Sequence, residues 1–160
     1  MKKITIEIKW GILFSVMSLL WMMLEKAAGL HDEYIDKHAV YTNLIAIPAI
    51  LLYFVALADK RKNQFMGFIT FRQGFISGLI ITLVATILAP LTQWITSTWI
   101  TPDYFNNVIR YVVEQGKMSQ TDAEAYFSMK NYIVQGLIFA PVMGIITSLI
   151  AAPAMQKKKK

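Results

Sequence analysis

The chain has 160 residues, and charged residues make up 16% of them, against about 25% in a typical soluble domain. The length predicts one domain. The apolar fraction of 56% excludes a disordered chain and argues against an ordinary water-soluble globule. The chain has no cysteine, which excludes disulfides, thiol catalysis and cysteine-ligated zinc or iron–sulfur sites. The net charge of +6 does not indicate a nucleic-acid partner, because the terminal run Lys157–Lys160 supplies four of the positive charges.

Four long stretches of the chain carry no charged residue, and each predicts a membrane span. A helix needs about 20 mainly apolar residues to cross a bilayer core of about 30 Å. The stretches are apolar all round, whereas a soluble helix of this length keeps a polar stripe. We therefore predict an all-α fold in which residues 1–160 form a single four-helix transmembrane bundle. The predicted spans cover about residues 8–29, 39–58, 74–99 and 132–154.

The first span has a second interpretation, as a secretory signal peptide. It has a basic start, an uncharged apolar run of 15 residues and a conceivable cleavage site at Ala27-x-Gly29. Glu25 and Lys26 lie just before that site and fit cleavage poorly. We therefore expect the stretch to be retained as a span that continues through these two charged residues.

The distribution of basic residues predicts how the chain is threaded through the membrane. The N-terminus, the loop at 59–73 and the basic tail at 157–160 together hold 11 of the 16 basic residues. The other connections hold the remaining five, together with eight of the ten acidic residues. By the positive-inside rule, both termini then lie in the cytoplasm. We interpret the basic tail as a stop-transfer anchor rather than as a lipid-binding site.

The long connection at 100–131 is predicted to contain helices. The sequence Thr101-Pro-Asp resembles an N-cap, a proline at the first helical position and an acidic first turn. Apolar residues then recur with helical spacing up to Gly116, the natural end of this helix. We expect a short amphipathic helix that lies on the outer membrane surface or caps the bundle. Ser119 begins a capping-box pattern for a further helix, which we expect to run into the fourth span.

Small residues on the third and fourth spans predict close helix packing, because they let helix backbones approach in lipid. The fourth span carries a small residue at every fourth position, and the third opens with a Gly-x-x-x-Gly pattern. Such rows favour a right-handed crossing of about −40°. We expect these two spans to pack against each other or against a second subunit. The candidate packing residues are Gly74, Gly78, Gly136, Ala140, Gly144 and Ser148.

The densest group of polar residues joins the first two spans on the predicted outer side. Glu25 would lie just below the membrane surface, where an ionisable group is a functional candidate. The alternative is that the helix begins earlier, near Ile4, so that Glu25 merely reaches the headgroups. We expect the Glu25 carboxylate to contact Lys26, His31 or Asn43. The candidate cluster consists of Glu25, Lys26, His31, Asp32, His38 and Asn43.

The same connection also permits a metal-binding interpretation, because imidazole and carboxylate groups are ligands of zinc. His31 and His38 are seven residues apart and would share one face of a helix. The sequence has, however, no His-Glu-x-x-His motif and no third imidazole. A solvated acidic loop explains the same residues. We therefore expect no metal ion and no other cofactor.

Motifs along nearly the whole chain resemble a known family. The first set is Trp21-x-x-x-Glu25-Lys26-x-x-Gly29-Leu30-His31-Asp32, His38-x-x-Tyr41-Thr42-Asn43 and Ile47-Pro48-Ala49. The second set is Phe75-Ile-Ser-Gly78, Pro90-x-x-Gln93, Glu124-Ala-Tyr-Phe127 and Lys130-Asn-Tyr. Together they resemble the DUF4199 family, a domain of unknown function found in bacterial membrane proteins. The resemblance implies a small four-helix protein of the inner membrane of Gram-negative bacteria, and it implies no activity.

The sequence has no nucleophile–base pair, phosphate-binding glycine loop or dinucleotide fingerprint. Our first hypothesis is therefore a non-enzymatic membrane protein that self-associates or serves as an accessory subunit of a membrane assembly. Its expected partners are the lipid bilayer and either a second copy or another membrane protein. The alternative is a small oligomeric transporter or channel with a polar path involving Glu25, Asn43, Gln93 and Gln135. A third hypothesis, an intramembrane metal enzyme, would use Glu25, His31, Asp32 and His38.

Overall fold

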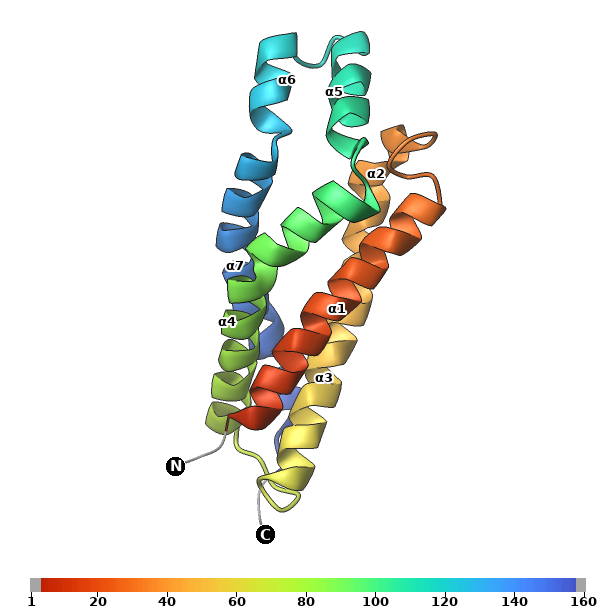
Figure 1. Cartoon of the computed structure of the whole chain (residues 1–160). Helices are drawn as coiled ribbons and strands as arrows, with labels where there is room; N and C mark the ends of the chain where they lie inside the picture. Colours follow the sequence, from red (N-terminus) through yellow and green to blue (C-terminus); the bar gives the residue numbers. More distant parts are fainter. Residues whose placement is uncertain (1–3, 158–160) are drawn as a thin grey trace.

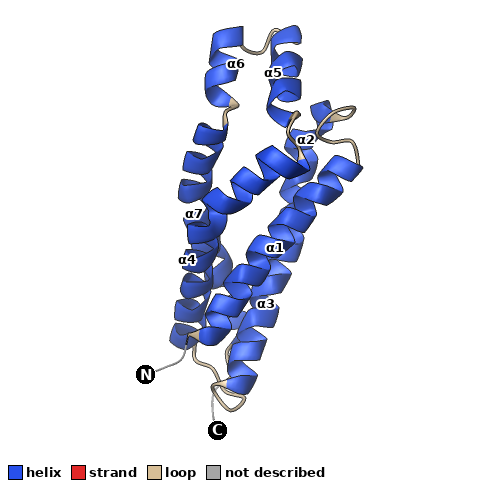
Figure 2. Ribbon diagram, in the orientation of Figure 1, coloured by secondary structure: helices blue, strands red, loops and turns tan. Residues whose placement is uncertain are grey.

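Helices account for almost the whole chain (Figures 1 and 2). The computed structural model describes residues 4–157, so most of the basic tail lies outside the described residues. The elements are α1 (Thr5–Ala27), α2 (Ile35–Tyr41), the 3-10 helix η1 (Thr42–Ile45), α3 (Ala46–Asn63), α4 (Phe71–Ile95), the π-helix η2 (Thr96–Ile100), α5 (Tyr104–Glu114), α6 (Gln120–Tyr126) and α7 (Met129–Met155). Within residues 4–157, β-type pairing is limited to one isolated bridge between Ile69 and Lys157. The predicted all-α fold class is confirmed.

Four segments are long and apolar enough to cross a membrane, as the uncharged stretches predicted. They are Thr5–Ala27, Ile35–Asn63, Phe71–Ile100 and Met129–Met155. The second of them consists of α2, η1 and α3, which follow one another directly. In Figure 1, the start of α1, the α3–α4 loop and the end of α7 lie at one end of the bundle, which we call the terminal end. The opposite end, which carries α5 and α6, is called the hairpin end.

At the terminal end, α1 and α3 extend further than predicted. α1 begins at Thr5 rather than at residue 8, and α3 ends at Asn63 rather than at residue 58. The added turns carry charges that pair between the two helices: Glu7 with Lys60 at 2.5 Å, and Lys9 with Asp59. A helix can continue past a charged residue in an apolar setting when a neighbouring helix supplies the opposite charge.

The loop between α3 and α4 is correspondingly short, covering 64–70 instead of 59–73. The basic residues of the predicted loop lie in the last turn of α3, except Arg72, which lies in α4. Thr70 ends the loop with a capping box. Its hydroxyl accepts a hydrogen bond from the backbone N–H of Gln73 at 3.2 Å, and the Gln73 side-chain oxygen accepts from the Thr70 N–H at 3.0 Å. The two side chains thereby satisfy two backbone N–H groups that have no partner within the helix, so α4 begins here, at Phe71.

α4 and α7 pack directly against each other through the predicted small residues. A Cβ atom built on Gly78 would lie 2.3 Å from the Ser148 hydroxyl, and one on Gly144 would lie 2.3 Å from Thr82. A Cβ on Gly74 would lie 3.3 Å from Ala152. The third and fourth spans are therefore partners within one chain, and their backbones approach as closely as these residues allow.

Gly136 does not take part in this contact with α4, which leaves for this residue the other predicted possibility, packing against a second subunit. A Cβ built there would meet no atom within 4 Å among the described residues. α4 bends away from α7 toward the end of α1 at the hairpin end, so α7 lacks this neighbour there (Figure 1). Pro90 lies in this half of α4 and interrupts its backbone hydrogen bonding. A further glycine contact that the row did not predict joins α1 to α4, where a Cβ on Gly11 would lie 2.5 Å from Val84.

The outer connection forms two helices that stand beyond the hairpin end of the bundle (Figure 1). α5 is amphipathic as predicted, and it buries Tyr104, Val108 and Val112 in a small core with Ala123 of α6. Gly116 follows α5 with a positive φ of 64°, which a glycine tolerates at a helix end. α5 thus packs on α6 rather than presenting its apolar face to a surface.

Two details of this connection differ from prediction. α5 begins at Tyr104 after Asp103, whose side chain makes no capping hydrogen bond, and Thr101 is buried instead of capping a helix. α6 also does not run into α7. Its last residue is Tyr126, and the Ser128 hydroxyl then accepts a hydrogen bond from the Asn131 N–H to begin a new helix. The side chain of Ser128 bonds the backbone locally, so the chain breaks between α6 and α7 although the helical spacing of apolar residues continues.

Candidate functional site

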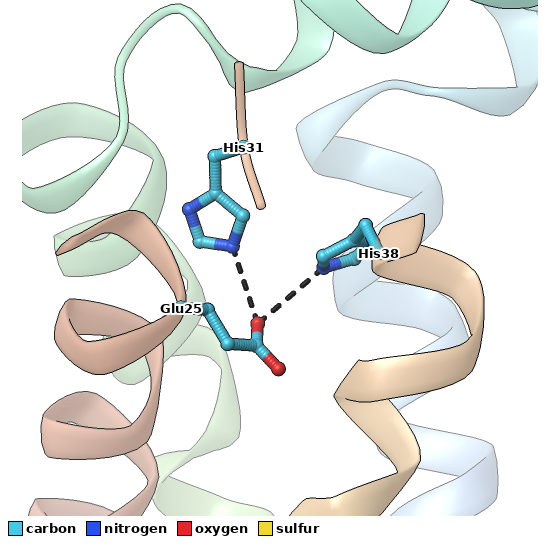
Figure 3. Close-up of side chains that lie close together, drawn as sticks. All are labelled: Glu25, His31 and His38. Carbon is cyan, nitrogen blue, oxygen red and sulfur yellow. Dashed lines mark hydrogen bonds and ion pairs between the residues drawn. The ribbon is translucent and has the colours of Figure 1, made fainter. Parts of the chain in front are cut away.

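Three residues of the predicted polar cluster meet at the hairpin end (Figure 3). Glu25 lies in the last turn of α1, His31 in the following turn and His38 in α2. Gly29, with φ of 74°, allows the chain to reverse, and the Tyr34 N–H then bonds the Gly29 carbonyl at 2.8 Å. The prediction that the two histidines share one helix face is therefore wrong. They approach Glu25 from two successive elements, the turn after α1 and helix α2.

Both imidazoles point toward one carboxylate oxygen (Figure 3). His31 Nε2 lies 3.2 Å and His38 Nε2 lies 3.4 Å from Glu25 Oε2. The other carboxylate oxygen accepts a hydrogen bond from Trp21 Nε1 at 2.5 Å. The side chains of Glu25 and His31 are each only 2% exposed, and that of His38 is 15% exposed. We call Glu25, His31 and His38 the Glu–His cluster.

α5 closes the Glu–His cluster from the other side. The Tyr104 hydroxyl lies 3.3 Å from His38 Nδ1 and 3.2 Å from the Tyr132 hydroxyl. The side-chain amide of Asn107 donates to the His31 carbonyl at 3.1 Å. Burial, with a smaller contribution from Tyr132, raises the pKa of Tyr104, so its hydroxyl stays protonated and can donate. Tyr104 and Asn107 thus tie the outer helices to the turn after α1.

The other predicted members of the cluster lie elsewhere. Lys26 donates to the Ile100 carbonyl at 2.5 Å, because consecutive residues of a helix point about 100° apart. Asp32 is exposed and accepts a hydrogen bond from the Glu33 N–H at 2.6 Å. Asn43, in η1, is exposed and donates to the Ala39 carbonyl of the preceding helix α2 at 2.9 Å. Of the three expected partners of Glu25, His31 is therefore the one that contacts it.

The residues considered for a polar path occupy separate places. Gln93 donates to the Ser97 hydroxyl at 2.8 Å, within the same continuous helical segment. Gln135 is half-buried in α7. Asn43 lines a cavity of about 460 Å³ between α1, α3, α4 and α7, whereas Glu25 lies in the Glu–His cluster. Most of the cavity lining is apolar, and it includes Phe14, Ile50 and Phe139.

Sequence reasoning missed a second buried polar group, at the terminal end. Glu7 and Lys60 pair at 2.5 Å with side chains that are 2% and 4% exposed. The Ser77 hydroxyl donates to the same carboxylate at 3.0 Å. This group joins α1, α3 and α4. The sequence gives a partial signal: opposite charges near the ends of the first two predicted spans suggest that ion pairs form, but they do not show which charges pair.

The Glu–His cluster offers two imidazoles and a carboxylate to a common point. One ligand atom from each residue lies within 4.8 Å of the other two. Such a set can share a proton, form an ion pair when an imidazole is protonated, or coordinate a divalent ion. No sequence signal connects Tyr104 with His38.

Comparison with known proteins places the chain in a family without an assigned activity. No curated protein and no solved structure matches it. The model of one family matches residues 9–157, which is nearly the whole chain. That family is described as a protein of unknown function, DUF4199. The chain therefore belongs to the DUF4199 family.

Proposed function

We propose that this chain is a non-enzymatic integral membrane protein that works by associating with a second copy of itself. The observation that carries the proposal is the outer half of α7. The small-residue row continues there beyond the contact with α4, through Ala140, which lines the 460 Å³ cavity, to Gly136. A Cβ built on Gly136 would meet no atom within 4 Å among residues 4–157 outside its own helix. In lipid, small residues at this spacing favour the approach of another helix.

The other helices of the chain leave part of this surface of α7 uncovered, and a helix from a second copy could cover it. α3 contacts α7 less extensively than α4 does, so the space between them is lined by small or apolar groups such as Ala46, Ala49 and Ala140. A partner helix would bury these groups without meeting a charged residue. A different membrane protein with a complementary face would make the chain an accessory subunit of a larger assembly.

The orientation belongs to the same proposal. The basic last turn of α3, the start of α1 and the end of α7 lie together at the terminal end, which supports placing that end in the cytoplasm. The hairpin end then faces the other side of a bacterial inner membrane. The absence of catalytic motifs from the sequence supports a role in assembly rather than in catalysis.

The proposal is tested by the mass of the purified protein. We expect the chain in mild detergent, measured by light scattering, to have the mass of a dimer or a larger oligomer. Ala140→Leu fills the cavity side of the row and should shift the mass toward the monomer. Ile138→Phe also adds bulk to α7, but at an exposed position outside the cavity lining, and should leave the mass unchanged. A monomeric wild-type protein, in detergent and in nanodiscs, with no copurifying membrane protein, would refute the proposal.

The transporter or channel alternative is supported by the cavity as well, since Asn43 lines it together with Ser18, Thr82 and Thr147. Polar groups inside a bundle can form part of a path. The other three predicted path residues lie outside this cavity lining, which favours self-association as the first proposal. Flux through proteoliposomes that Asn43→Leu abolishes would reverse that order.

A further inference from the structure

We propose that Glu25, His31 and His38 bind one divalent transition-metal ion, with zinc as the best match. This inference goes beyond self-association and does not rest on it. It departs from the expectation of no metal, which rested on the absence of a third imidazole. The last turn of α1 supplies the Glu25 carboxylate as the third ligand, and three donor atoms gather within 4.8 Å of one another.

The separations of the donor atoms suit such an ion. Zinc bonds of about 2.0–2.1 Å in tetrahedral geometry place two ligand atoms about 3.3 Å apart. His31 Nε2 and His38 Nε2 lie 3.2 Å and 3.4 Å from Glu25 Oε2. Each imidazole nitrogen therefore already has the separation from the carboxylate oxygen that two ligands of one zinc ion have. The two imidazole nitrogens lie within 4.8 Å of each other, and binding of the ion requires them to approach to about 3.3 Å.

The kinds of donor determine the kind of ion. Mg²⁺ and Ca²⁺ prefer sets of oxygen ligands, whereas two imidazoles with one carboxylate suit zinc and related transition metals. Three protein ligands leave a fourth position free for water or another small ligand. The His38 side chain is 15% exposed, so water or a small ligand could reach the fourth position beside it.

An unsatisfied atom points independently to a ligand. His38 Nε2 is buried and, apart from its 3.4 Å approach to Glu25 Oε2, makes no hydrogen bond among the described residues, although it faces the centre of the cluster. The opposite nitrogen of the same ring lies 3.3 Å from the Tyr104 hydroxyl, which in turn lies 3.2 Å from the Tyr132 hydroxyl. If Nδ1–H donates to Tyr104 and Tyr104 donates to Tyr132, the Nε2 lone pair is directed at the ion.

This arrangement is the one that metal-binding histidines use, because a partner on the second nitrogen selects the tautomer and orients the ring. Asn107 holds His31 in a different way, through its backbone carbonyl at 3.1 Å. The ion would join the end of α1, the following turn and α2. Through Tyr104 it would also couple α5 to the bundle.

The experiment uses the full chain with a histidine-free affinity tag, purified in mild detergent. The protein is stripped with a chelator, exposed to Zn²⁺ and desalted, and its metal content is measured. Parallel samples receive Co²⁺, whose visible spectrum reports tetrahedral nitrogen and oxygen ligation. We expect one zinc ion per chain, a tetrahedral Co²⁺ spectrum and loss of that spectrum when zinc is added.

Variants assign the ion to the cluster. Glu25→Gln and His38→Ala should both lose the bound zinc. The matched control is Asp32→Asn, which removes an exposed carboxylate next to His31 and should keep the zinc. Tyr104→Phe should bind about 10–100-fold more weakly, since it removes only the group that orients a ligand. A cluster held by hydrogen bonds alone predicts no such graded series.

Each remaining outcome overturns the proposal. Wild-type protein that retains no zinc refutes it directly. Retention of zinc by both Glu25→Gln and His38→Ala places the ion elsewhere, and equal loss in Asp32→Asn indicates a surface ion. Should a cluster variant fail to fold, the wild-type Co²⁺ spectrum decides, because an octahedral aquo spectrum excludes ligation by the histidines. Self-association is read from the mass and can fail while zinc binding succeeds, or the reverse.

Discussion

Gly144→Ala tests how closely α7 approaches α4. The new Cβ would lie 2.3 Å from both Cγ2 and Oγ1 of Thr82 and 2.8 Å from its Cβ. Non-bonded carbon atoms prefer about 3.5–4.0 Å, so the helices must separate locally by more than about 1 Å. Thr82 cannot simply rotate away, because its hydroxyl donates to the Gly78 carbonyl at 2.9 Å and lies 2.7 Å from the Tyr53 hydroxyl.

The expected loss of stability follows from two opposing effects. Overpacking of this kind costs about 1–3 kcal/mol, and replacing glycine by alanine within a helix recovers about 0.5–1 kcal/mol. We therefore expect Gly144→Ala to lower the free energy of unfolding by about 1–2 kcal/mol. Gly136→Ala is the matched control, because its Cβ would meet no atom within 4 Å, and it should be neutral or slightly stabilising.

The assay is reversible unfolding in mixed micelles, followed by far-ultraviolet circular dichroism as the fraction of denaturing detergent rises. Gly144→Ala should unfold at a lower fraction than the wild type, and Gly144→Leu at a still lower one. Equal midpoints for Gly144→Ala, Gly136→Ala and the wild type would show that α4 and α7 are not in contact at Thr82, and the packing argument would be wrong.

Three further predictions concern other parts of the molecule. Glu7→Gln should destabilise the bundle by about 3–5 kcal/mol, because it removes one partner of a buried ion pair, and adding Lys60→Met should restore part of that loss in the same unfolding assay. Reporter fusions after Lys62 should register cytoplasm and fusions after Lys117 periplasm, and the opposite result would exclude the proposed orientation. Burial raises the pKa of Tyr104, so the folded state keeps this proton to a higher pH than the unfolded chain does. Stability should therefore fall as the pH rises above about 10, and less steeply in Tyr104→Phe; identical slopes would contradict this.

Some of this structure could be predicted from the sequence because it depends on neighbouring residues only. An uncharged stretch of span length indicates a membrane helix whatever surrounds it. Gly116 ends α5 and Ser119 begins α6 through their own backbone conformations and hydrogen bonds. Small residues spaced four apart on one helix likewise predict a close contact, which Gly78 and Gly144 make.

The sequence does not predict a feature whose environment depends on a second helix. Nothing local to Gly136 distinguishes it from Gly144, yet a Cβ on Gly144 would meet Thr82 of α4 whereas one on Gly136 would meet no atom within 4 Å in the described part of the chain. The charges of α1 left its start open between residue 8 and the alternative near Ile4, which the structure bears out, because Glu7 pairs with Lys60 of another helix. A span end that carries a charge is therefore ambiguous until its partner is known.

The chain by itself determined which residues lie near the first connection, and the tertiary structure decided which of them form a site. Glu25, Lys26, His31 and Asn43 are equally polar candidates in the sequence. The turn at Gly29 directs His31 back to Glu25, whereas Lys26 points to η2 and Asn43 donates to the backbone of the adjacent helix α2. Tyr104 completes the cluster from 66 residues beyond His38. Sequence periodicity reports the faces of single helices, but only the packing of helices against one another brings such distant side chains within hydrogen-bonding distance.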